Sequence, residues 1–189
     1  MSLLTYNELV KLWEANVLTY ADGSRIPKEH INGASIDITL GNVFKEEVVP
    51  EAFSDSFFDL REGDDSFREV VIPDGDYFIL HAKEFILAET REFFNLPDDV
   101  ACEYKLKSSL ARCGLQHLLA GWGDPSWYGS TMTLEFVNAR RYKLMQLYPG
   151  MKIGQVVFWR GEAVPESQLY RHRGQYNNQS KAQGSKGVK

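Results

Sequence analysis

One carboxylate interrupts an apolar segment of the chain, and it is the side chain best suited to acid/base chemistry. Glu135 lies in the segment 131–137, Thr-Met-Thr-Leu-Glu-Phe-Val. If this segment is a strand, its two-residue period places Met132, Leu134 and Phe136 on one face and Glu135 on the other. On a hydrated sheet face, which is the commoner case, Glu135 is a solvated charge. In a pocket it could take up and release protons as a general acid/base.

The segment 107–115, Lys-Ser-Ser-Leu-Ala-Arg-Cys-Gly-Leu, has residues that could bind phosphate. The segment predicts one short helical turn that is opened by its serines and closed by its glycine. Free backbone N–H groups, two hydroxyls and two cations at the start of such a turn suit a phosphate group. An ordinary capped turn has the same pattern, and the segment taken alone favours that simpler interpretation.

A third segment, 120–129, interleaves two tryptophans and a tyrosine with glycines. Such a loop lets backbone and aromatic rings approach a ligand closely. The alternative is a hairpin corner whose aromatic side chains fill the core. Asp124 stands before Pro125 in this loop, so its carboxylate could serve a ligand or simply form the turn.

Short strands must position these residues. The chain has 189 residues, of which 43% are hydrophobic and 25% charged, as expected for one folded domain. A helix is predicted after Thr5, which has capping-box spacing to Glu8 and is followed by an apolar stripe. Strands are predicted at 36–40, 77–80, 85–88, 131–137 and 153–159, with turn sequences between them. Strands that follow one another with almost no helix between them predict an antiparallel sandwich or barrel.

Composition and missing motifs exclude several classes of function. The sequence has no phosphate-binding P-loop and no dinucleotide-binding glycine pattern, and its two cysteines cannot build a zinc deaminase site. The net charge is −5, with acidic residues crowded between Glu46 and Asp99, which argues against a nucleic-acid partner. No apolar run approaches membrane-spanning length, and residues 1–17 are not typical of a signal peptide. We therefore expect a cytoplasmic protein without a membrane partner.

Several segments in order resemble the dCTP deaminases of the trimeric dUTPase superfamily. They are 31–42 (Ile-Asn-Gly-Ala-Ser-Ile-Asp-Ile-Thr-Leu-Gly-Asn), 85–90, the Ser-Ser-Leu-Ala-Arg turn, Gly123-Asp124-Pro125, Leu134-Glu135-Phe136, 149–155, and Tyr170 with 175–179 in the tail. No single segment is decisive, but the ordered set covers most of the chain at nearly the spacing of the family.

The resemblance implies a mainly β fold, a distorted antiparallel β-barrel or jelly-roll of dUTPase-like type with a short N-terminal helix. Residues 1–170 would form this single domain, and residues 171–189 a flexible basic C-terminal tail that closes over the nucleotide site. The implied reaction is hydrolytic deamination of dCTP, or of a closely related deoxycytidine nucleotide, to dUTP and ammonia. It needs no zinc, and Mg²⁺ is bound through the triphosphate rather than by protein ligands. The implied assembly is a homotrimer with active sites between subunits.

Roles for individual residues follow from the same resemblance. Glu135 matches the catalytic acid/base, while Ser108 and Arg112 match residues that hold the attacking water and the glutamate. The other matches assign substrate binding to Lys107, Ser109, Ala120, Asp124, Thr133, Leu134, Tyr170, Gln175 and Gln179. Within that set, Lys107 and Ser109 would hold phosphate oxygens, and Asp124 the deoxyribose 3′-hydroxyl.

Departures from the family pattern leave other functions open. Gly121 and Trp122 stand where bacterial members have His and Arg, and Gln175 stands where a phosphate-binding Lys is expected, although Lys181 is close enough to substitute. One alternative is a dUTP diphosphatase, alone or combined with deamination, in which Asp124 helps to activate water against the α-phosphate. A further alternative is a non-catalytic nucleotide sensor, which the retained Glu135 disfavours.

Overall fold

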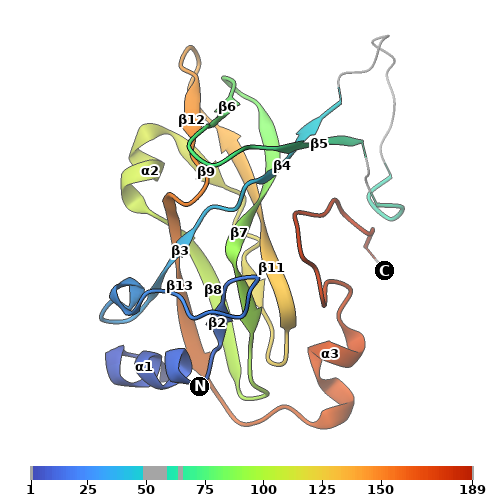
Figure 1. Cartoon of the computed structure of the whole chain (residues 1–189). Helices are drawn as coiled ribbons and strands as arrows, with labels where there is room; N and C mark the ends of the chain where they lie inside the picture. The colour runs from blue at the N-terminus through green and yellow to red at the C-terminus, as the bar shows by residue number, and fades with distance from the viewer. Residues whose placement is uncertain (1, 49–58, 64–65, 189) are drawn as a thin grey trace.

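The computed structural model describes residues 2–48, 59–63 and 66–188, and antiparallel strands are the main elements of that part of the chain (Figure 1). The strands are β1 (Ser2–Leu3), β2 (Leu18–Thr19), β3 (Ile36–Thr39), β4 (Val43–Glu47), β5 (Phe67–Val71), β6 (Phe78–Leu80), β7 (Phe85–Asn95), β8 (Val100–Leu106), β9 (Leu115–His117), β10 (Trp122–Gly123), β11 (Tyr128–Asn138), β12 (Met145–Leu147) and β13 (Lys152–Arg160). The α-helices are α1 (Tyr6–Glu14), α2 (Ser108–Cys113) and α3 (Tyr170–Arg173), and short 3₁₀ turns lie at Lys28–His30 and Glu166–Gln168.

Two antiparallel sheets make up the body of the molecule. One has the order β1-β13-β8-β10 with β3 also paired to β13, and the other has the order β5-β4-β7-β11-β9 with β2 also paired to β7. A small sheet of β12 and β6 lies at one end. Buried aromatic residues from both main sheets, among them Phe94 and Phe136 of one and Phe158 of the other, form one core. The predicted mainly β, antiparallel fold is confirmed.

The long central strand β11 has the alternation that its sequence predicts. Met132, Leu134 and Phe136 are buried in the core, whereas Glu135 is only partly exposed on the opposite face. On that opposite face Glu135 pairs with Leu87 of β7 and Thr133 pairs with Glu89. Every second side chain of β11 is therefore available to line a site.

The helix at the front begins where it was predicted, but its cap differs. Thr5 is the N-cap residue of α1, yet its side chain makes no capping hydrogen bond. The Glu8 carboxylate instead accepts hydrogen bonds from Lys11 (2.7 Å) and from Arg160 of β13 (2.9 Å). The capping box was thus wrong, because a partner 152 residues away in the chain competes for Glu8.

The prediction of the second helical turn was correct in its position and wrong in its N-cap residue. Helix α2 ends at Gly114, which has a left-handed φ of 95°, as a closing glycine requires. Its N-cap is Lys107 rather than a serine, and no side chain caps it. Ser108, Ser109 and Arg112 are all exposed, so their polar groups face outward from this chain.

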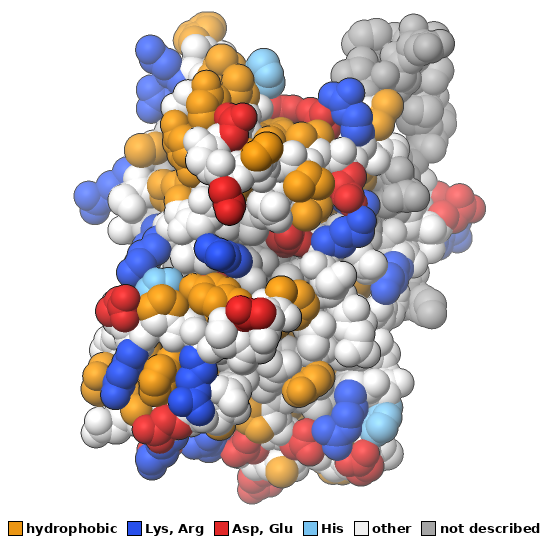
Figure 2. Space-filling view, in the orientation of Figure 1, with side chains coloured by type: hydrophobic (Ala, Val, Ile, Leu, Met, Phe, Trp, Pro, Cys, Tyr) orange, Lys and Arg blue, Asp and Glu red, His pale blue; other side chains and the backbone are white. Residues whose placement is uncertain are grey.

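Charged groups are spread over the surface, and the face drawn in Figure 2 shows acidic and basic side chains interspersed. None of the helices in the described part of the chain is long and apolar enough to span a bilayer. Within residues 2–48, 59–63 and 66–188, no three His, Cys, Asp or Glu side chains gather closely enough to hold a metal ion.

Two glutamates on β7 are buried, and this makes stability depend on pH. Glu92 is fully buried and its carboxylate accepts hydrogen bonds from the Thr39 N–H (3.0 Å) and the Thr39 hydroxyl (2.5 Å). Burial raises the pKa of Glu92 to about 7, and burial likewise raises the pKa of Glu89 to about 7. The folded protein therefore keeps protons that the unfolded chain releases near its ordinary pKa of 4.5.

We expect the stability contributed by Glu92 to be fully present below about pH 4.5 and to be lost as the pH rises to about 7. For a pKa shift of this size the loss is at most about 3 kcal/mol. Urea unfolding of the wild type and of Glu92→Gln at about pH 5 and about pH 8 tests this. The Gln variant should gain stability relative to the wild type at the higher pH. An equal pH dependence in both proteins would contradict the assignment, and the exposed Glu162→Gln serves as the control.

Candidate active site

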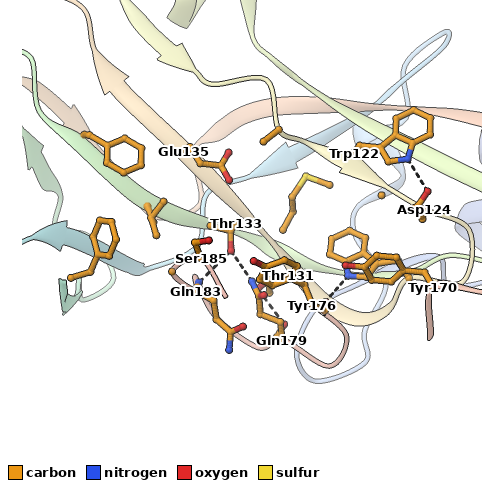
Figure 3. Close-up of a pocket in the computed structure, with 18 residues that line it drawn as sticks. Trp122, Asp124, Thr131, Thr133, Glu135, Tyr170, Tyr176, Gln179, Gln183 and Ser185 are labelled. Atoms are coloured by element: carbon orange, nitrogen blue, oxygen red, sulfur yellow. Dashed lines mark hydrogen bonds between the residues drawn. The ribbon is translucent and has the colours of Figure 1, made fainter. Parts of the chain in front are cut away.

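A cavity of about 460 Å³ lies against the face of β11 that carries Glu135. Its walls come from β7, β11, the loop around β10, and the C-terminal segment that follows β13 (Figure 3). The predicted site residues that line it are Ala120, Asp124, Thr133, Glu135, Tyr170 and Gln179. The pocket therefore gathers half of the residues assigned from the sequence.

Glu135 lies toward one end of this pocket (Figure 3). Its side chain is 23% exposed, so the carboxylate is neither in bulk water nor sealed in the core. The Nε2 atom of His117 lies 3.2 Å from its Oε2 atom, although the two are not aligned as a hydrogen bond. A partly enclosed carboxylate in a cavity is the arrangement that acid/base chemistry requires.

His117 is one of the site residues that the sequence analysis missed. Its Nδ1 atom accepts a hydrogen bond from the Leu119 N–H (3.3 Å), so in the neutral ring the proton is on Nε2 and faces Glu135. The register of β9 against β11 places His117 opposite Phe136, next to Glu135 in the chain. Among scattered histidines no local pattern marks His117, and only this strand pairing could have revealed it.

Packing against a residue of the other main sheet fixes the orientation of the His117 imidazole. The His117 ring lies on the ring of Tyr104 of β8, with centroids 4.7 Å apart. The Tyr104 hydroxyl donates a hydrogen bond to the Ile153 carbonyl (3.1 Å). Gly154 leaves room for this, because a Cβ there would lie 2.1 Å from the Tyr104 ring. The orientation of His117 thus depends on contacts in both sheets.

Asp124 and Trp122 occupy the other end of the pocket (Figure 3). The indole Nε1 of Trp122 donates a hydrogen bond to Asp124 Oδ1 (3.0 Å). Both residues are exposed, whereas Trp127 is buried and stacks on Phe94 at 5.0 Å between centroids. Trp127 fills the core, as the second interpretation of this loop predicts, while Trp122 lines the cavity, where contact with a ligand stays a prediction.

The C-terminal segment forms the remaining wall. Tyr170, Tyr176 and Gln179 line the pocket, and Gln179 Nε2 donates a hydrogen bond to Thr133 Oγ1 (2.7 Å). Trp127 Nε1 donates to the carbonyl of Tyr176 (2.8 Å). The segment is thus attached to β11 and to the loop before it.

Acidic groups of the body pair with cations of this segment. Arg171 contacts Asp98 of the body and Glu166 of its own segment, each at 2.8 Å, and Lys181 contacts Glu69 of the body at 2.6 Å. Gln175 is not among the lining residues, and its carbonyl accepts a hydrogen bond from Lys186 (2.5 Å). Gln175 carries no charge and Lys181 is paired with Glu69, so neither residue gives the pocket a free cation in this arrangement.

The residues assigned to α2 and its cap do not line this pocket within one chain. Lys107 contacts the buried Asp37 at 2.5 Å, and Lys152 contacts the same carboxylate at 2.9 Å. Burial raises the pKa of Asp37, but hydrogen bonds from Lys107, Lys152 and Asn32 outweigh it and hold that pKa below its usual value. The predicted residues outside the pocket are Lys107, Ser108, Ser109, Arg112, Leu134 and Gln175. The side chain of Leu134 belongs to the core.

Comparison with known proteins gives a consistent family. Residues 3–161 match the family described as dCTP deaminase-like. A Persephonella marina protein named "dCTP deaminase, dUMP-forming" is 39% identical over 150 residues, which cover 79% of this chain and 78% of that protein. A Thermomicrobium roseum protein named "dCTP deaminase" is 39% identical over 132 residues, which cover 68% of this chain and 64% of that protein.

A solved structure supports the fold. The crystal structure of 2′-deoxycytidine 5′-triphosphate deaminase from Agrobacterium tumefaciens matches 92% of this chain with a TM-score of 0.63 and 18% sequence identity. The match covers 53% of that chain, so the present chain spans about half its length. This likeness concerns the fold alone, and it agrees with the mainly β class predicted from the sequence.

Proposed function

Since the chain belongs to the dCTP deaminase-like family, we propose that it removes the amino group of dCTP by hydrolysis, with Glu135 as the acid/base. The observation that carries this proposal is the partly enclosed Glu135 carboxylate in a cavity, facing His117 at 3.2 Å. A cavity of about 460 Å³ is in the range typical of small-molecule sites.

In the proposed reaction Glu135 both accepts and donates protons. Water attacks C4 of the cytosine ring, forming the C–O bond, and Glu135 takes the proton that the water loses. Glu135 passes this proton to N3 as the tetrahedral intermediate forms. It then takes the proton of the new C4 hydroxyl and gives it to the amino group, so that the C–N bond breaks, ammonia leaves and C4 becomes a carbonyl. A positioned acid/base of this kind typically contributes ~10²–10⁴-fold in rate.

The oriented donors for the intermediate would come from a second copy of the chain. Ser108 and Arg112 are exposed and lie outside the pocket of their own chain. We therefore propose the homotrimer that the family resemblance implies, with α2 of one subunit completing the pocket of the next. Lys107 and Ser109 would then meet the triphosphate there. Magnesium enters this scheme as part of the substrate, bound to its phosphates, and no zinc takes part.

The nucleotide product of the reaction is either dUTP or dUMP. The sequence analysis expected dUTP and kept the combined deaminase and diphosphatase as the alternative. The Persephonella relative is named dUMP-forming, which favours that alternative. We accordingly propose that a second water attacks the α-phosphate, breaks its bond to the bridging oxygen, and yields dUMP and diphosphate. Asp124, exposed at the pocket end opposite Glu135, is the carboxylate available to orient that water.

One assay tests both steps. The purified protein is incubated with Mg²⁺ and either dCTP or dUTP, and ammonia, diphosphate and nucleotides are measured. Ammonia with dUMP and diphosphate from dCTP supports the combined reaction, whereas ammonia with dUTP alone restricts it to deamination. Diphosphate from dUTP without ammonia from dCTP would indicate a diphosphatase, and no product from either nucleotide would refute the proposal.

His117 should act as a positioning residue for Glu135. His117→Phe keeps an aromatic ring against Tyr104 but removes the N–H that faces the carboxylate. Because this N–H lies 3.2 Å from the carboxylate without an aligned hydrogen bond, it can orient Glu135 only as a nearby dipole, and we expect kcat to fall by about tenfold with little change in KM. Steady-state kinetics of ammonia release measure this, with the exposed His81→Phe as the control. An equal effect of both substitutions would contradict the role of His117.

A further inference from the structure

The C-terminal segment lines the pocket, and hydrogen bonds between the Gln179 backbone and strand β11 hold it there. Gln179 donates its N–H to Ser130 Oγ (3.1 Å) and accepts a hydrogen bond from the Thr131 N–H (2.8 Å). Gln183, Gly184 and Ser185 follow it and line the cavity (Figure 3). Whatever fixes the chain between Gln179 and Ser185 therefore fixes one wall of the pocket.

Two adjacent amides of this segment are bound by a pair of side chains on the sheet. The Ala182 N–H donates to Glu89 Oε2 (2.8 Å), and the Gln183 N–H donates to Thr133 Oγ1 (3.3 Å). Glu89 of β7 and Thr133 of β11 are directly opposite in the strand register. Ala182 is fully buried at this point, so the segment is seated on the sheet rather than passing over it.

The Glu89 side chain is buried in a space that the absence of a side chain at Gly41 leaves free. The side chain is 5% exposed, and a Cβ on Gly41 would lie 2.5 Å from Glu89 Cγ. Its other backbone donor is Val43 at the start of β4, while Lys181 and Glu69 are the charged groups nearby. Burial raises the pKa of Glu89 to about 7, and in either protonation state the side chain has a carboxyl oxygen that can accept the Ala182 N–H.

We propose that Glu89 is a positioning residue that anchors the C-terminal segment through the Ala182 amide and so builds the wall formed by residues 183–185. Its importance for dCTP retention rests on the proposed function, but the anchoring itself does not. Glu89 touches neither the reacting atoms nor Glu135, and it acts on the site only through the segment that it holds.

Hydrogen exchange of the full-length protein without nucleotide tests the anchor. Glu89→Met conserves the side-chain volume and removes the acceptor, whereas Glu89→Gln keeps an acceptor oxygen. We expect the protection factors of the Ala182 and Gln183 amides to fall about tenfold or more in the Met variant and to return in the Gln variant. Amides of β8 and β13, in the other sheet, should keep their protection in both.

Other outcomes would overturn the anchor. Unchanged protection of Ala182 in Glu89→Met would show that the segment is held elsewhere. Loss of protection throughout both sheets would show that Glu89 supports the sheet itself rather than the segment. In a parallel kinetic measurement, KM for dCTP should rise more than kcat falls in the Met variant. If the wild type does not turn over dCTP, the proposed function fails while the exchange result still decides the role of Glu89.

Discussion

Glu135→Gln should abolish deamination while the protein still binds the nucleotide. The amide has nearly the shape of the carboxylate, but it cannot accept the proton of the attacking water, so kcat should fall by at least ~10²–10⁴-fold. Partial enclosure of the side chain and the adjacent His117 restrict replacement of this group by solvent hydroxide or buffer. Ammonia release measures the first effect, and equilibrium binding of dCTP with Mg²⁺ measures the second.

The matched control is Glu162→Gln, because Glu162 is exposed and outside the pocket. This control should behave as the wild type in both measurements. Turnover by Glu135→Gln at the wild-type rate would show that another group moves the protons. Loss of nucleotide binding together with turnover would instead assign Glu135 to substrate binding, and the assignment as acid/base would then be wrong.

Two inactive variants should restore activity when mixed. Glu135→Gln damages the pocket, and Arg112→Ala damages the exposed helix α2, which lies outside that pocket in the same chain. If each site takes Glu135 from one subunit and Arg112 from the next, random exchange of equal amounts leaves both residues intact in about a quarter of the sites. The mixture should therefore recover up to about a quarter of the wild-type activity per chain.

The exchange is made by mild denaturation and refolding of the two variants together, followed by the ammonia assay. Ser108→Ala mixed with Arg112→Ala is the control, since both changes lie on α2 and no intact site can form. Recovery only in the first mixture supports a site shared between subunits. Absence of recovery, with exchange demonstrated by mass spectrometry, would mean that α2 does not complete a neighbouring pocket.

The sequence predicted much of the fold because local alternation was clear where one sheet face is buried. The alternation around Leu134 and the glycine that ends α2 both gave the right local structure. Strand β8 was missed, although Val100, Cys102 and Tyr104 are buried and the polar Glu103 and Lys105 alternate with the last of them. The capping box at Glu8 failed because its competitor, Arg160, belongs to the far end of the chain.

The site was predicted only in part, for a related reason. Glu135 and Asp124 could be named because their neighbours in sequence resemble a family pattern, and the structure places both at the cavity. The contact between His117 and Glu135 depends on the register of two strands, and the contact between Glu89 and Ala182 spans 93 residues. Neither leaves a local signature. The roles of the assigned residues stay predictions until the variants are measured.

Gly154 of β13 affects the position of the Glu135 carboxylate of β11, although the two strands belong to different sheets. A methyl group there would push against Tyr104, and Tyr104 lies on His117, which in turn faces Glu135. Since protein interiors are closely packed, a displacement of Tyr104 would also displace the residues that it contacts. Replacements at this position should therefore be tolerated poorly during evolution for a reason unrelated to backbone turning: a larger side chain would displace Tyr104 and His117, and with them the Glu135 carboxylate.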